Sequence, residues 1–388
     1  MNGREDCLLQ LEGWRLVRRK LLGLSAILIV TLCAVTARAE ILIGVAGPMT
    51  GTLAWYGEQF ERGADRAVAD LNATGGVLRE QVELITADDF CDPEQAVAAA
   101  KKLVSDGVIL VVGHFCSGAS IPASEIYAAG GVLMISPAST NPMLTEVGRA
   151  NVFRVVYRDD SAGIMAGNYL ADHWSDRKIA ILHDNTTFGK GVADLTKEQL
   201  NRRGLSEVIY QAYVPGGNNY AAEITELQAA EIDVVFIGGY QAEVALIARQ
   251  ARERGYPVQL VTGVGLTAED FGLIAGPAAE GTLFVDVADR RANPEAAPVV
   301  ERFRALGFEP QGYTLYAYAA VQVWAQAAEK AGSLELEAMI ASLREHRFDT
   351  VLGPIDFDDK GDLTAQNPVW YVWRGDTYVP LEQDTAQE

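Results

Sequence analysis

Short runs of apolar residues alternate with helical segments through the first half of this 388-residue chain. The runs are continuously apolar, which is typical of strands covered on both faces of a sheet. They span residues 41–46, 82–87, 108–112 and 132–135. Segments with apolar residues at helical spacing lie between them, at residues 53–72, 92–105 and 121–129. This alternation favours a parallel, doubly wound α/β sheet.

The same alternation begins again after residue 153. Further strands are predicted at residues 178–182, 206–213, 234–237 and 259–262, with helical segments between them. The chain is long enough for two domains of ordinary size. The fold class that we expect is therefore α/β, with two lobes that each contain a doubly wound parallel sheet.

A serine in a glycine-flanked stretch marks the carboxyl end of one predicted strand. Ser117 lies within residues 113–120, between that strand and the next predicted helix. In doubly wound sheets ligands bind beyond the carboxyl ends of strands, and Thr50 and residues 138–140 fall at such ends as well. A hydroxyl group and free N–H groups before a helix suit a carboxylate or another anion. The alternative is an ordinary strand-to-helix turn that binds nothing.

The first 39 residues have the organisation of a secretory signal peptide. The basic stretch from Arg15 to Lys20 precedes an apolar segment at residues 21–35, and an A-x-A cleavage site ends at Ala39. We expect cleavage after Ala39 and export to the periplasm. A retained membrane anchor is the alternative, which is disfavoured because a membrane-spanning helix needs about 20 apolar residues.

Charge and cysteine content indicate which partners the mature chain can bind and whether it can form a disulfide. Without residues 1–39 the chain has 26 basic and 49 acidic residues, a net charge of −23. This acidity argues against nucleic acid and anionic membranes as partners. Cys91 and Cys116 are the cysteines that remain. An exported compartment permits a disulfide between them, worth on the order of 3 kcal/mol; two unpaired buried thiols are the alternative.

No pattern in the sequence indicates catalysis. The four histidines show no H-E-x-x-H metal-ligand spacing, and there is no Walker sequence, G-x-G-x-x-G stretch or G-x-S-x-G nucleophile elbow. We therefore expect no enzymatic activity, no catalytic residue, no cofactor and no metal. A transcription regulator is disfavoured because the chain has no basic DNA-binding segment. The ligand-sensing module of a membrane receptor stays open as an alternative.

A set of short stretches distributed along the chain carries a family resemblance. The stretches are Ile43 to Gly51, Ala54 to Gly57, Gly63 to Gly76, Asp88 to Pro93, Gly113 to Ser117, Ile135 to Thr140, His183-Asp184, Phe188-Gly189, Gly238 to Tyr240 and Gly353 to Asp362. Together they resemble the branched-chain amino acid binding proteins of ABC importers. Cys91 and Cys116 with their flanking residues are specific to the leucine/isoleucine/valine-type branch, so the resemblance implies that these two cysteines are paired.

This resemblance implies a type I periplasmic binding protein fold, in which three crossings join two lobes that close over a small ligand. It places the crossings near residue 157, near residue 285 and at residues 345–365. The first lobe would comprise residues 40–157 and 286–350, and the second residues 158–285 and 365–388. The implied function is amino-acid transport by a monomer that delivers its ligand to a membrane permease.

The resemblance also implies which residues bind the ligand. Ser117 would hold the ligand carboxylate with its hydroxyl and N–H groups, and Thr140 would contact the carboxylate and the ammonium. Ala138 would contribute its backbone, and Tyr240 would close over the ligand from the second lobe. The family lines its side-chain pocket at positions that match Trp55, Tyr56 and Tyr313.

Two positions depart from the family pattern. Phe188 replaces a tyrosine, and Val264 replaces the acid that pairs with the ligand ammonium. An enclosed ammonium without a counter-charge would cost several kcal/mol. Either another acid substitutes, with Asp159, Asp160, Asp184 and Glu243 as candidates, or the ligand lacks a free α-ammonium. A branched-chain or related amino acid is the leading ligand; an amide, a urea-like molecule or an aromatic carboxylate is the alternative, for transport or for chemosensing.

Overall fold

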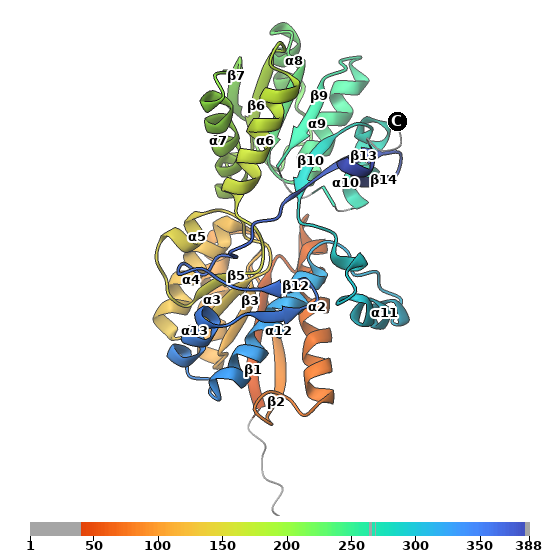
Figure 1. Ribbon diagram of the computed structural model, residues 1–388. Helices are drawn as coiled ribbons and strands as arrows, with labels where there is room; N and C mark the ends of the chain where they lie inside the picture. Colours follow the sequence, from red (N-terminus) through yellow and green to blue (C-terminus); the bar gives the residue numbers. More distant parts are fainter. Residues whose placement is uncertain (1–39, 264–265, 268, 385–388) are drawn as a thin grey trace, which may run out of the picture. The chain divides into compact units, whose positions relative to one another are not determined.

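A five-stranded parallel sheet forms the first half of the protein (Figure 1). The computed structural model describes residues 40–263, 266–267 and 269–384, so the predicted signal peptide and Val264 lie outside the described residues. The strand order is β2-β1-β3-β4-β5. The strands are β1 (Glu40–Gly47), β2 (Gln81–Asp88), β3 (Leu110–Gly113), β4 (Leu133–Ser136) and β5 (Val152–Arg154).

Helices cover both faces of this first sheet. Helix α2 packs against α12, and α3 packs against α4. Because right-handed crossovers lead to β2 on one side of β1 and to β3 and β4 on the other, α2 lies on the opposite face from α3 and α4. The helices are α2 (Ala54–Ala73), α3 (Pro93–Asp106), α4 (Ser117–Gly130), α5 (Met143–Glu146), α12 (Thr314–Ala331) and α13 (Leu336–Glu345).

Local chemistry sets the ends of these helices. At α3 the Asp92 carboxylate accepts hydrogen bonds from the N–H groups of Glu94 and Gln95, Pro93 occupies the first position, and Gly107 ends the helix at a φ of 84°. Helix α4 begins at Ser117, four residues before the predicted start at residue 121. The predicted start was wrong because residues 117–120, which the glycine pattern had suggested were a loop, form the first turn of the helix, with Ser117, Ala119 and Ser120 buried.

The second sheet has seven strands, in the order β14-β13-β10-β9-β8-β6-β7. Five of them are parallel, and β13 and β14 add an antiparallel edge beside β10. Strand β14 was not predicted from the sequence. The strands are β6 (Ile179–His183), β7 (Ile209–Ala212), β8 (Val234–Gly238), β9 (Gln259–Thr262), β10 (Leu283–Asp286), β13 (Val369–Arg374) and β14 (Thr377–Pro380).

Helix α6 (Asp159–His173) connects β5 of the first sheet to β6 of the second. Between the strands of the second sheet run α7 (Thr187–Arg202), α8 (Ala221–Ala229), α9 (Gln241–Glu253) and α10 (Glu269–Ala275). Smaller elements are α11 (Ala297–Ala305), α14 (Leu381–Asp384) and the hairpin of β11 (Phe348–Thr350) and β12 (Gly353–Ile355). The chain passes between the two sheets after β5, after β10 and after β12. The predicted α/β class with two parallel-sheet lobes is therefore confirmed, whereas the residue boundaries of the lobes stay a prediction.

A buried arginine ties one of these passages to the first sheet. Arg154 ends β5 with no exposed surface, and its Nε lies 2.6 Å from Asp362 Oδ1. Its Nη1 donates to the carbonyl oxygens of Ser139 at 2.9 Å and Asn141 at 3.0 Å. Arg158 Nη1 reaches the other oxygen of Asp362 at 2.6 Å. The passage after β12, strand β5 and the loop after β4 thus meet at one buried ion-pair network.

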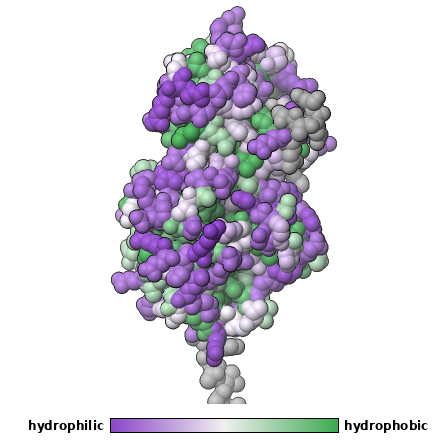
Figure 2. All heavy atoms as spheres, viewed as in Figure 1, coloured by the Kyte–Doolittle hydropathy of each residue, from purple (hydrophilic) through white to green (hydrophobic). Residues whose placement is uncertain are grey.

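None of the helices in the described part of the chain combines the length and the hydropathy that a bilayer span requires. The face in Figure 2 is largely hydrophilic, with apolar side chains scattered over it in small groups.

Replacing Asp362 with alanine should lower the free energy of unfolding by about 3–5 kcal/mol, because the buried guanidinium of Arg154 would lose its counter-charge. Urea unfolding of the ligand-free protein measures this. Lys360→Ala removes an exposed ion pair with Glu146 and should cost less than about 1 kcal/mol. Equal losses in the two variants would contradict the interpretation.

Candidate functional site

Each sheet has a point at which the strand order reverses. In the first sheet this point lies between β1 and β3, and in the second between β6 and β8. Ligands of doubly wound sheets bind beyond the carboxyl ends of the strands at such points. Three predicted ligand residues follow these strands directly: Ser117 after β3, Phe188 after β6 and Tyr240 after β8.

Ser117 is the first residue of α4 and is buried. Its hydroxyl oxygen accepts a hydrogen bond from the backbone N–H of Asn141 at 3.3 Å. Because a hydroxyl has one hydrogen and two acceptor positions, this contact leaves the Ser117 hydrogen available to donate. The amino end of α4 adds the positive end of the helix dipole. Together these groups suit a carboxylate.

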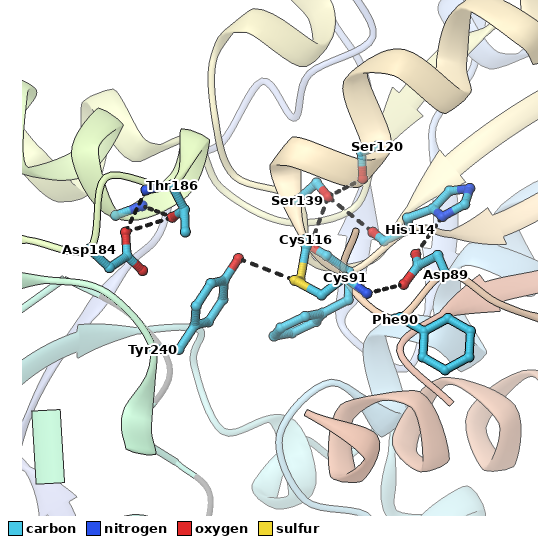
Figure 3. The surroundings of a disulfide bond; sticks show 12 residues. Asp89, Phe90, Cys91, His114, Cys116, Ser120, Ser139, Asp184, Thr186 and Tyr240 are labelled. Carbon is cyan, nitrogen blue, oxygen red and sulfur yellow. Dashed lines mark hydrogen bonds and ion pairs between the residues drawn. A yellow bond between two sulfur atoms is a disulfide. The ribbon is translucent and has the colours of Figure 1, made fainter. Parts of the chain in front are cut away.

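The loop after β4 folds directly against the turn that carries Ser117. Ser136 Oγ donates to the carbonyl oxygen of His114 at 3.0 Å and accepts from the N–H of Ser139 at 2.9 Å. Ser139 Oγ bonds in turn to the hydroxyl of Ser120 on α4 (Figure 3). This serine network brings Ala138 and Thr140, both buried, to the same edge of the sheet as Ser117.

A disulfide anchors the same turn from the other side. Cys91 and Cys116 are bonded, with their Cα atoms 5.4 Å apart, which confirms the pairing. The buried carboxylate of Asp89 accepts from the N–H of Cys91 at 2.8 Å and lies 2.6 Å from Nδ1 of His114 (Figure 3). His114 Nε2 lies 2.8 Å from the hydroxyl of Tyr127 on α4. Sequence reasoning missed this Asp89–His114–Tyr127 chain, although two of its members adjoin the stretches that contain the cysteines.

An aromatic cluster lies beside this turn. The rings of Tyr56 and Phe115 are stacked with centroids 4.2 Å apart, and Tyr313 meets Phe115 edge-on at 5.5 Å. Tyr56 and Tyr313, predicted to line a side-chain pocket, are therefore brought together, and Phe115 joins them without having been predicted. Trp55 instead packs against Phe308, with ring centroids 6.5 Å apart.

Tyr240 connects the second sheet to this cluster. Its ring lies 5.2 Å from the ring of Phe188 and 6.2 Å from that of Phe115. Its hydroxyl lies 4.0 Å from Sγ of Cys91 (Figure 3). A disulfide sulfur carries no hydrogen, so the hydroxyl is the donor of this weak contact. Burial, followed by the charge of Asp184, raises the pKa of Tyr240 well above its usual value, so the hydroxyl stays protonated.

Asp159 supplies a buried carboxylate next to Thr140. It begins α6, has no exposed surface and donates its N–H to the Thr140 carbonyl oxygen at 2.9 Å. Neither carboxylate oxygen makes a hydrogen bond of normal geometry within the described residues. Burial raises the pKa of Asp159 to about 7, although the Thr140 side chain and the Arg154 guanidinium both act to lower it.

The other three candidate acids differ in what they already bind. Asp184 is buried, and its Oδ1 accepts from the N–H and hydroxyl of Thr186 at 2.8 and 2.7 Å, while Oδ2 has no partner among the described residues. Burial raises the pKa of Asp184 to about 6. Asp160 pairs with Arg158 at 2.9 Å, and Glu243 accepts from the N–H of residue 216 at 2.9 Å. Asp159 and Asp184 are thus the acids with oxygens left for a ligand.

Gly239 shows how closely the turn before Tyr240 approaches Asp184. A Cβ atom at Gly239 would collide with the hydroxyl of Tyr213 and lie 3.3 Å from Asp184 Oδ2. The Tyr213 hydroxyl likewise has no hydrogen-bond partner in the described part of the chain. Sequence reasoning did not find Tyr213. Among residues 40–263, 266–267 and 269–384, no cluster of histidine, cysteine or acidic side chains has the geometry to hold a metal ion.

The chain is similar to known binding proteins over nearly its whole length. The model of a family described as periplasmic binding protein matches residues 40–376. Leu/Ile/Val-binding protein homolog 2 of Brucella abortus is 46% identical over 351 residues, which cover 89% of this chain and 95% of that protein.

Solved structures agree with the sequence comparison. The leucine binding protein LivK of Thermotoga maritima is 28% identical with a TM-score of 0.80, covering 88% of this chain and 97% of that one. The branched-chain amino acid transporter substrate binding protein LivJ of Streptococcus pneumoniae, solved with isoleucine, is 26% identical with a TM-score of 0.79, covering 88% of this chain and 98% of that one.

The Asp159 carboxyl makes the stability of the ligand-free protein depend on pH. Its folded-state pKa of about 7 lies above its usual value of 3.8, so the folded protein binds this proton more tightly than the unfolded chain. The free energy of unfolding is therefore larger at low pH, and it falls as pH rises towards 7, by at most about 4 kcal/mol. Urea unfolding at pH 4.5, 5.5 and 7 should show that the free energy of unfolding of Asp159→Asn increases relative to that of the wild type as pH rises. A pH-independent difference would contradict this.

Proposed function

Because this chain belongs to the periplasmic binding proteins, in the branch of the Leu/Ile/Val-binding proteins of ABC transporters, we propose that it binds a branched-chain or related aliphatic amino acid. In this proposal the residues from Glu40 onwards form the mature protein, which is exported after cleavage at Ala39. The protein acts in the periplasm as a monomer and delivers the amino acid to the permease of an ABC importer.

The buried carboxylate of Asp159, which has no ion-pair partner among the described residues, is the observation that carries this proposal. The N–H of Asp159 donates to the carbonyl oxygen of Thr140. The N–H of Asn141, the residue after Thr140, donates to the hydroxyl of Ser117. One short loop therefore joins a group that suits an anion to a buried carboxylate that suits a cation. A free amino acid carries both charges on neighbouring atoms, so this pairing supports a zwitterionic ligand.

The proposed mechanism is capture by lobe closure. The ligand carboxylate binds to the hydroxyl of Ser117, the amino end of α4 and the backbone around Ala138 and Thr140. The ligand ammonium binds to Asp159, with Asp184 as the alternative acid, so that one of these carboxylates replaces the acid that is missing at Val264. Phe188 and Tyr240 cover the ligand from the second sheet. Such a ligand stabilises the closed arrangement because it binds both halves at once.

The side chain of the ligand is proposed to contact the aromatic cluster of Tyr56, Phe115 and Tyr313. Burial of an aliphatic side chain against these rings contributes about 25 cal/mol per Å² of apolar surface removed from water. The cluster has no charged member, so it favours an apolar side chain over a charged one. Trp55 is proposed to support the side-chain pocket from outside the cluster, through its packing on Phe308.

Leucine and 4-methylpentanoate, which lacks the amino group, form the test of the ammonium site. We expect titration calorimetry at pH 7.5 to show binding of leucine and much weaker binding of 4-methylpentanoate. Asp159→Asn should weaken leucine by about 10- to 100-fold, because a charge-assisted hydrogen bond contributes about 1.5–3 kcal/mol, and should change 4-methylpentanoate little. The leucine affinity of Asp184→Asn is measured in parallel, and the variant with the larger loss of affinity identifies the acid that pairs with the ammonium. A thermal shift with benzoate, acetamide or urea, and none with leucine, isoleucine or valine, would refute the amino-acid proposal.

Replacing Ser117 with alanine should weaken leucine binding by about 10-fold, since one hydrogen bond to the ligand carboxylate is lost. Ser124→Ala is the matched control, because Ser124 lies buried on the same helix and donates to the carbonyl oxygen of Ile121 at 2.7 Å. The control should lower the melting temperature without changing the affinity. Unchanged affinity in Ser117→Ala would remove Ser117 from the site.

A further inference from the structure

Asn141 forms hydrogen bonds to elements of both sheets. It is buried in the loop after β4, two residues beyond the serine network. Its side-chain Oδ1 accepts from the N–H of Met143 at 2.9 Å, which fixes the rotamer. Its Nδ2 donates to the carbonyl oxygen of Thr187, the first residue of α7, at 2.8 Å. Its backbone N–H donates to the hydroxyl of Ser117 at 3.3 Å.

The backbone contact of Asn141 orients a ligand-binding group. A serine hydroxyl that accepts from a fixed N–H has its own hydrogen directed elsewhere. The carbonyl oxygen of Asn141 is itself held by Arg154 at 3.0 Å, so the N–H group cannot turn away freely. The position of Asn141 thus restricts the directions in which Ser117 can donate.

The side-chain contact of Asn141 depends on a close approach of α4 and α7. A Cβ atom at Gly191, one turn into α7, would lie only 2.5 Å from Asn141 Nδ2. A Cβ atom at Gly118, the second residue of α4, would lie 3.3 Å from Oγ1 of Thr187. Glycine at 191 leaves the space that the amide of Asn141 occupies, and glycine at 118 leaves room for the side chain of Thr187. Phe188 follows Thr187, and its ring lies 5.2 Å from the ring of Tyr240 at a tilt of 40°, so the same contact positions the second-sheet side of the site.

We propose that Asn141 is a positioning residue that joins the orientation of Ser117 to the approach of α7, and so slows the release of bound ligand. This inference rests on the proposed function, because it assigns Asn141 a role in the closure of that site. The hydrogen bond to Thr187 exists only while the elements of the two sheets are together. It therefore stabilises the closed arrangement without contributing to the first encounter with the ligand.

Two variants remove the hydrogen bond between Asn141 and Thr187, one by a change at Asn141 and one by a change on α7. Asn141→Ala deletes the donor, and Gly191→Ala displaces it sterically while Asn141 stays in place. Alanine also has a higher helix propensity than glycine, so Gly191→Ala should leave the melting temperature of the ligand-free protein unchanged or raise it. Lys190→Ala is the matched control, because Lys190 lies on the same turn of α7 and pairs with Asp194 on the surface.

Stopped-flow fluorescence with leucine separates the rates. We expect Asn141→Ala and Gly191→Ala each to raise the dissociation rate constant by about 3- to 10-fold, as for one lost hydrogen bond, with the association rate constant within about twofold of the wild type. The double variant should be no worse than the poorer single variant, because both act on one bond. A merely structural role would lower the melting temperature and the active fraction but leave the dissociation rate of active protein unchanged.

Spin labels at Lys102 on α3 and Glu198 on α7 test the closure itself. Distance distributions from pulsed electron resonance are measured without ligand and with saturating leucine. The short-distance fraction should fall in Asn141→Ala and Gly191→Ala under each condition and stay as in the wild type in Lys190→Ala. An unchanged fraction in both variants, or unchanged dissociation rates, would overturn the role of Asn141. Failure of the wild type to bind leucine would contradict the proposed function instead, and the ligand-free distances would still decide the role of Asn141.

Discussion

The buried ion pair of Arg154 and Asp362 determines where the first half of the candidate site can lie. Desolvation lowers the pKa of Arg154, and the charge of Asp362 opposes that shift; a buried guanidinium is tolerable only with such a partner. Nη1 of Arg154 donates to the carbonyl oxygens on either side of Thr140. The loop that carries Ala138, Thr140 and Asn141 is therefore fixed from behind by a residue that never needs to touch a ligand.

The same pairing explains why Asp159 is left without a cation. Arg154 is near enough to Asp159 to lower its pKa, but its ion pair is with Asp362. Arg158 is likewise engaged by Asp160 and Asp362. A fold selected for stability alone would neutralise or remove the Asp159 carboxylate, since a buried carboxylate without a cation of its own is destabilising. Local violations of this kind concentrate where a protein binds something.

The sequence allowed the strand–helix alternation, the two sheets and the strand ends at Ser117, Phe188 and Tyr240 to be predicted, because these follow from periodicity and the resemblance. The start of α4 was misplaced, since the glycine pattern suggested a loop at residues 117–120 where the helix has its first turn. Asp159 could not be separated from its neighbour Asp160, because which carboxylate turns inward depends on tertiary packing. The contacts of Arg154 with Asp362 and of Asn141 with Thr187 join residues far apart in the chain, and no local pattern reports them.

Protonation of Asp159 and binding of an ammonium oppose each other, because an ammonium favours the charged form of the carboxyl group. With a pKa of about 7 in the ligand-free protein, a substantial fraction of the molecules carries the neutral acid at neutral pH. An ammonium at this position favours the charged form and lowers the pKa, so capture of an amino acid would release part of a proton. A ligand without an ammonium would leave the acid neutral and release none. The charge state of one buried side chain thus distinguishes the two ligand classes through the physics of desolvation.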